Sequence, residues 1–220
     1  MPKTEDYLAL DGAIDQQFQA NLTPYEAFCL LKSGHDRFLN HLTHRRSRGN
    51  LLADVSSGQY PYAAVLGCID SRVPVEEVFD AAFGDMFVAR VAGNTVSPEI
   101  LGSLEYACKY AGAKLILVLG HTKCGAVQGA WAELEDGNIT ELLSHIKPAV
   151  DQVKAERGTE ANEANINACV TANVELTVEQ IRRKSETLKT LEEAGKIALV
   201  GGLYDISTGE VTFVSEPTWT

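Results

Sequence analysis

Two cysteines and one histidine have the residue types and spacing of a metal site. Cys68 lies in the first third of the chain, and His121 and Cys124 follow later as a His-x-x-Cys pair. Thiolate and imidazole are ligands that Zn²⁺ prefers, and three protein ligands leave a fourth position open. The alternative is two buried cysteines and an incidental histidine, because a cysteine after an apolar run is commonly a core residue.

The local sequence places these residues at the ends of predicted strands. The apolar run 62–67 (YAAVLG) ends at Cys68, and the run 114–120 (KLILVLG) ends at His121. Open α/β sheets bind their ligands beyond the carboxyl ends of the strands. This placement favours a metal site over two core cysteines.

The remaining pattern predicts an α/β fold: a mainly parallel four-stranded sheet with an antiparallel edge strand, flanked by helices. We expect a single domain over 1–220, in which residues 1–45 form an N-terminal helical arm that packs on a partner subunit. Ser33-Gly34 is predicted to break the first helix, and 43–58 is predicted to be a loop. The predicted strands are 62–67, 85–91, 114–120, 196–203 and 210–214; the predicted helices are 24–32, 35–42, 73–79, 97–111, 124–134, 140–157, 162–184 and 187–194.

Composition limits the classes of function. The net charge is −11 and the pI is about 4.9, which argues against a nucleic-acid or anionic-membrane surface and favours a small substrate. The sequence contains no stretch that predicts a membrane span and no N-terminal signal pattern, so we expect a cytoplasmic protein. A mature secreted or periplasmic form whose signal peptide had been removed would show the same pattern.

Other candidate sites have simpler interpretations. His35, His41 and His44 are interpreted as solvated surface residues, because no cysteine or carboxylate completes a site at the right spacing. Cys29, Cys108 and Cys169 are interpreted as small core residues. Neither G-x-G-x-x-G nor the P-loop motif occurs, so the sequence does not support a dinucleotide or P-loop site.

The chain resembles the β-class carbonic anhydrases over roughly residues 23–214, because several motifs of that family occur in the family's order. The motifs are CIDSR at 68–72, RVAGN at 90–94, GSLEY at 102–106, HTKCG at 121–125 and GGLYD at 201–205. The resemblance implies Cys68, His121 and Cys124 as zinc ligands. It also implies reversible hydration of CO₂ to bicarbonate and a proton by zinc-bound hydroxide, in a homodimer that can assemble into a tetramer.

The resemblance makes Asp70 and Arg72 a catalytic carboxylate–guanidinium pair. Two thiolates cancel the formal charge of zinc and weaken it as a Lewis acid, so a neighbouring group that stabilises hydroxide matters more. Asp70 can accept the hydroxide's hydrogen, and Arg72 can hold Asp70 ionised. In some family members the aspartate leaves the arginine and becomes a fourth zinc ligand in a closed state. The motif by itself leaves open which state this chain prefers. The alternative is a solvent-exposed pair that contributes little.

The family's substrate pocket corresponds here to Gln59, Phe87, Tyr106 and Gly125. Gln59 would donate a hydrogen bond to CO₂ or bicarbonate, and the two aromatic residues, which the family takes from the partner subunit, would form an apolar wall. Taken singly, the aromatic residues would be assigned to the core. Gly125 would let its backbone N–H approach the bound species.

Two alternatives to CO₂ hydration are open. Relatives hydrolyse carbonyl sulfide or carbon disulfide with the same zinc site, and a non-catalytic zinc-stabilised binding protein would need a closed four-ligand site.

One departure from the family is also informative. Members inhibited by bicarbonate at a second site carry a tryptophan where this chain has Val65. We therefore expect no inhibitory pocket and an open site at neutral pH.

Overall fold

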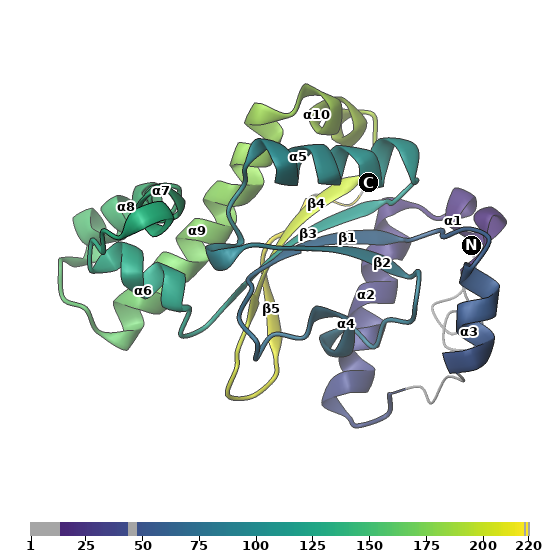
Figure 1. Ribbon diagram of the computed structural model, residues 1–220, viewed down its shortest axis with the longest axis horizontal. Coiled ribbons are helices and arrows are strands. Elements are labelled where there is room, and N and C mark those ends of the chain that lie inside the picture. Colours follow the sequence, from purple (N-terminus) through teal and green to yellow (C-terminus); the bar gives the residue numbers. More distant parts are fainter. Residues whose placement is uncertain (1–13, 44–47, 218, 220) are drawn as a thin grey trace.

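A five-stranded sheet with helices on both faces forms the centre of the computed structural model, which describes residues 14–43, 48–217 and 219 (Figure 1). The strand order is β2-β1-β3-β4-β5; the first four are parallel, and β5 is antiparallel to β4. This confirms the predicted sheet and its antiparallel edge. The strands are β1 (Ala63–Gly67), β2 (Met86–Arg90), β3 (Leu115–His121), β4 (Ala198–Tyr204) and β5 (Val211–Ser215).

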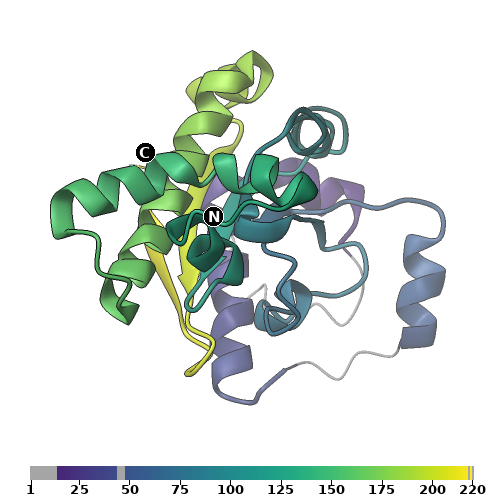
Figure 2. The ribbon, with the colours of Figure 1, turned by 60° about the vertical axis from the view of Figure 1, so that its left-hand side comes forward.

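The helices cover both faces and one end of the sheet. α2 (Pro24–Leu39) and α4 (Val75–Val78) lie on one face; α5 (Pro98–Glu105), η3 (Tyr106–Tyr110) and α10 (Glu186–Glu193) lie on the other (Figure 1). Beyond the carboxyl ends of the parallel strands lie α6 (Gly125–Trp131), α7 (Gly137–Ser144) and α8 (Lys147–Arg157), which come forward in Figure 2. The long α9 (Glu163–Lys184) packs against α8 and the sheet. No described helix is long and apolar enough to cross a membrane.

Alternate residues of β3 join two separate layers of the core. Leu115, Leu117 and Leu119 pack with the α2 side, whereas Ile116 and Val118 pack with the α9 and α10 side. All five are fully buried. A strand covered by helices on both faces needs a continuous apolar run, which is why 114–120 could be recognised in the sequence.

The predicted break at Ser33-Gly34 is wrong, because α2 continues through it to Leu39. A Cβ at position 34 would collide with the carbonyl oxygen of Phe79. Gly34 therefore lets the helix approach the segment after α4, and it does not end the helix.

Two other helix predictions need correction. The segment predicted to be a loop contains α3 (Arg48–Val55), and the single helix predicted over 140–157 is divided into α7 and α8. Pro148 explains the division: a proline ring clashes with the carbonyl four residues before it, and α7 ends at that residue, Ser144.

The N-terminal helices pack on the chain's own sheet. α1 (Gln16–Asn21) lies within the predicted helical arm, although its bounds were not predicted. It buries Gln19, whose Nε2 donates to the carbonyls of Pro61 and Ala111 at 2.7 Å each. α2 buries Phe28 and Leu31 in the core. Contact of this arm with a partner subunit stays a prediction, and residues 1–13 and 44–47, including His44, lie outside the described part of the chain.

Candidate metal centre

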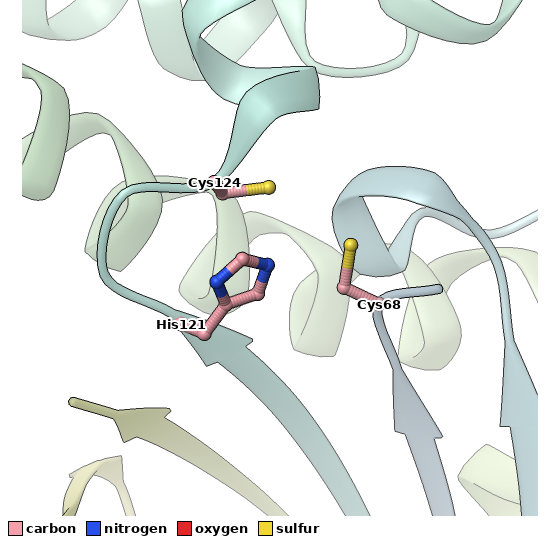
Figure 3. A group of neighbouring side chains, drawn as sticks. All are labelled: Cys68, His121 and Cys124. Carbon is pink, nitrogen blue, oxygen red and sulfur yellow. The ribbon is translucent and has the colours of Figure 1, made fainter. Parts of the chain in front are cut away.

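The fold brings Cys68, His121 and Cys124 together at the carboxyl ends of two adjacent parallel strands. Cys68 follows β1, His121 is the last residue of β3, and Cys124 caps α6. Their ligand atoms all lie within 4.8 Å of one another, and the three side chains point into a common space (Figure 3). The residues are 4%, 0% and 1% exposed, respectively. The arrangement fits a small cation held by sulfur and nitrogen.

The single side-chain hydrogen bond of His121 orients the imidazole to bind a cation. Its Nδ1 lies 2.9 Å from the carbonyl oxygen of Thr122, which can only accept, so Nδ1 carries the proton. The second nitrogen, Nε2, then presents a lone pair, and it is buried without a hydrogen-bond partner. Thr122 is itself fixed, because its N–H donates to Tyr204 at 2.9 Å and its Oγ1 accepts from Ile206 at 3.1 Å. An orphaned lone pair beside two thiols suits a metal ion of the zinc type.

The two thiols differ in acidity. A hydrogen bond from Cys124, helped by His121 and by the backbone N–H groups of Gly93 and Asp70, lowers the pKa of Cys68 to about 4. The neighbouring Cys68 sulfur and burial raise the pKa of Cys124. The first thiolate of the pair therefore forms readily, and its charge together with burial opposes ionisation of the second thiol. A bound cation favours ionisation of both.

Asp70 and Arg72 form a two-pronged ion pair beside the cluster. Arg72 donates from Nε to Oδ1 at 2.9 Å, from Nη2 to Oδ2 at 2.7 Å, and from its backbone N–H to Oδ1 at 2.9 Å. These bonds lower the pKa of Asp70. Asp70 Oδ2 lies 3.8 Å from Nε2 of His121, so the carboxylate borders the same space. In this structure Asp70 is hydrogen-bonded to Arg72 and lies next to the Cys68, His121 and Cys124 group without being part of it.

Arg90 is a site residue to which the sequence analysis assigned no task. It ends β2, and from there its Nε donates to the carbonyl of Cys68 at 2.8 Å and its Nη2 to the carbonyl of Asp70 at 2.6 Å. Arg90 thus fixes the backbone on both sides of Ile69. In the sequence, Arg90 stood out only as a charged residue at the end of an apolar predicted strand. Its contacts with Cys68 and Asp70 could not be predicted without knowing that β2 pairs with β1.

Three of the four predicted substrate residues, Gln59, Phe87 and Tyr106, lie away from the metal cluster of their own chain. Phe87 and Tyr106 meet edge to face with ring centroids 6.3 Å apart, in a cavity of about 550 Å³ between β2 and α5. None of the three clustered residues lines that cavity. Gln59 precedes β1 and lies at the opposite end of that strand from Cys68. Tyr106 is 57% exposed, which leaves it free to face another subunit.

Gly125, in contrast, lies at the cluster. It is the first residue of α6, directly after Cys124, and a Cβ built on it would meet nothing within 4 Å. The space beside its backbone is therefore open.

The interpretation as a surface residue is wrong for His35, whereas His41 is exposed as expected. His35 is buried on the inner face of α2, where Nδ1 lies 3.1 Å from the carbonyl of Val78 and Nε2 accepts from the N–H of Val211 at 3.0 Å. Its role is to join α2 to α4 and β5. Cys108 and Cys169 are buried core residues as expected, whereas Cys29 is only partly buried.

The fold and the cluster define a class: an α/β protein with a buried Cys-His-Cys group at the carboxyl ends of a parallel sheet. Comparison with known proteins agrees. The family model for carbonic anhydrase matches residues 63–211. Carbonic anhydrase 2 of Mycobacterium tuberculosis is 33% identical over 192 residues, which cover 86% of this chain and 92% of that protein.

Solved structures share the architecture. A β-carbonic anhydrase from Coccomyxa, solved with acetazolamide, is 29% identical with a TM-score of 0.68 and covers 73% of this chain and 75% of its own. One chain from the crystal structures of two tetrameric β-carbonic anhydrases of Sordaria macrospora matches the fold at 23% identity, with a TM-score of 0.70, over 84% of this chain and 95% of that chain. This chain belongs to the carbonic anhydrase family, in its β class.

Proposed function

We propose that this enzyme catalyses the zinc-dependent, reversible hydration of CO₂ to bicarbonate and a proton. Cys68, His121 and Cys124 hold the zinc, and Asp70 with Arg72 forms the catalytic pair. The observation that carries the proposal is the buried three-ligand cluster with a carboxylate at its border, 3.8 Å from Nε2 of His121.

The ligand set explains the need for the carboxylate. A zinc ion held here would lower the pKa of a bound water from ~15.7 to about 7 and so supply a nucleophile at neutral pH. Cys68 and Cys124 contribute two negative charges and His121 none, which balances a divalent cation and weakens its pull on the water. A second group that favours the deprotonated nucleophile is then required.

Asp70 supplies that group. Arg72 holds it ionised and fixes both of its oxygens, so that Oδ2 can accept a hydrogen from a nucleophile in the adjacent space and orient its lone pair toward CO₂. Arg90 fixes the backbone between Cys68 and Asp70. The open space beside Gly125 leaves room for the substrate and for a donated backbone hydrogen bond.

A homodimer completes the substrate pocket in this proposal. Gln59, Phe87 and Tyr106 lie away from the cluster of their own chain, and Tyr106 is exposed, so they would line the site of a second subunit. The tetrameric state named for the Sordaria enzymes supports further assembly of such dimers as part of the proposal.

Metal analysis together with CO₂ hydration tests the function. We expect about one zinc per chain and rapid stopped-flow hydration in the wild type, and loss of both in Cys68→Ala, which removes one of three ligands. Retention of zinc in Cys68→Ala would refute the ligand set. Stoichiometric zinc without CO₂ turnover, or turnover of carbonyl sulfide alone in a parallel assay, would refute the assigned reaction.

A further inference from the structure

A backbone N–H outside both ligand motifs contacts a ligand sulfur. Gly93, in the 3₁₀ turn η2 (Ala92–Asn94) after β2, donates from its N–H to Sγ of Cys68 at 3.4 Å. A hydrogen bond to a thiolate withdraws electron density from the sulfur, which leaves a bound metal more electron-poor and stabilises the ionised ligand. The position of Gly93 therefore affects the metal site.

Gly93 can occupy this position only as a glycine. Its φ of 70° lies in the left-handed region, and a Cβ there would lie 2.5 Å from Cδ1 of Ile146 and 3.3 Å from the Cβ of Ala126. The same lack of a side chain makes the residue conformationally free, so something else must fix it.

Asn173 fixes it from α9. Its Nδ2 donates to the carbonyl of Gly93 at 2.8 Å, and the residue is 2% exposed. The same turn of α9 packs on the ligand strand: a Cβ at Gly120, next to His121, would lie 2.5 Å from Cγ2 of Val174. One turn of α9 therefore contacts residues next to two of the proposed ligands.

We propose that Asn173 is a positioning residue for the metal centre, which acts by holding the Gly93 N–H on the Cys68 thiolate. The Gly93 N–H that contacts Cys68 and the Gly93 carbonyl that accepts from Asn173 belong to successive peptide groups. Asn173 therefore acts by fixing the position of Gly93 and not by polarising its N–H. The inference rests on the proposed ligation by Cys68. Asn173 lies outside every motif that identified the family.

The test compares Asn173→Leu with Asn165→Leu. Asn165 is a matched control because it is also buried on α9 and its Nδ2 also donates to a backbone carbonyl at 2.9 Å, but to that of Glu160 and not to that of Gly93. We expect zinc affinity, measured by competition with a chromophoric chelator, to fall by about 10- to 100-fold in Asn173→Leu only. The sulfur-to-metal charge-transfer bands of the Co²⁺-loaded protein should shift in the same variant only.

Equal effects of the two substitutions, or a wild-type affinity and spectrum in Asn173→Leu, would overturn the inference. If leucine at position 173 prevents folding, the smaller pair Asn173→Ala and Asn165→Ala decides by the same measurements. Both readouts are independent of CO₂ turnover. Zinc binding that survives Cys68→Ala would instead reject the proposed ligand set, and this inference with it.

Discussion

Replacement of Arg90 by methionine tests whether the backbone between Cys68 and Asp70 must be held for activity. Methionine keeps much of the apolar stem and removes both guanidinium hydrogen bonds. The bond to the Cys68 carbonyl is partly buried, and a hydrogen bond from a charged donor there contributes about 1.5–3 kcal/mol. The bond to the Asp70 carbonyl is exposed, and water can replace most of it. We therefore expect a loss of about 2 kcal/mol in the free energy of unfolding.

The expected consequence for Arg90→Met is a melting temperature lower by about 4–8 °C, because each kcal/mol shifts a chain of this size by about 2–4 °C. Loosening of the segment that carries Asp70 should also lower kcat/KM for CO₂ by about tenfold or more, since small displacements of catalytic groups have large effects. The assays are thermal unfolding and stopped-flow CO₂ hydration.

Arg182→Met is the matched control for this experiment. Arg182 also forms a two-pronged contact, with Glu192 at 2.8 Å on each side, but between α9 and α10 and away from the metal cluster. It should lower stability and leave kcat/KM unchanged. Equal kcat/KM values in the two variants would refute the assignment of Arg90 to the site.

Three further predictions concern pH, assembly and the buried histidine. Arg72 lowers the pKa of Asp70, so the ion pair is complete above the ordinary carboxyl pKa and is lost only as pH falls through the lowered value. Between about pH 8 and 7, kcat/KM should therefore fall only as far as protonation of the proposed nucleophile requires, at most about tenfold. A steeper loss, or a structure at pH 7 with Asp70 on the metal, would refute this. If Tyr106 contributes to the partner's site, a dimer of one Asp70→Asn chain and one Tyr106→Ala chain has one intact site of two. Random pairing of equal amounts makes about half of the dimers mixed, so activity should recover to about a quarter of the wild-type value. No recovery would place both residues in the site of one subunit. His35→Phe leaves the Val211 N–H without its acceptor and should lower the free energy of unfolding by about 1–3 kcal/mol, with kcat/KM unchanged. An unaltered chemical denaturation curve would contradict a stabilising role for this hydrogen bond.

Local sequence was sufficient to predict an element where a single physical requirement, such as burial or capping, determined its residues. The run at 114–120 had to be a buried strand because a parallel strand covered on both faces tolerates few polar residues, and β3 follows it closely. Thr23, Pro24 and Glu26 predicted the start of α2, and the capping box is present. The prediction failed at Ser33-Gly34 because the role of Gly34 depends on Phe79, which is distant in the chain. Pro148, in the middle of 140–157, is the local signal for the division into α7 and α8.

The sequence by itself determined the chemistry available to this protein: which residues can bind zinc, which carboxylate and guanidinium accompany them, and which family they resemble. The tertiary structure decided what holds those residues. Arg90 reaches Cys68 and Asp70 because β2 pairs with β1, and Asn173 reaches Gly93 because α9 crosses the sheet near the ligands. Both contacts end on backbone atoms, which every residue type carries, so no sequence pattern marks the target. The placement of Gln59 away from its own cluster follows from the direction of β1, whereas the separate cavity of Phe87 and Tyr106 depends on how α5 and η3 pack beside β2, which no local pattern shows.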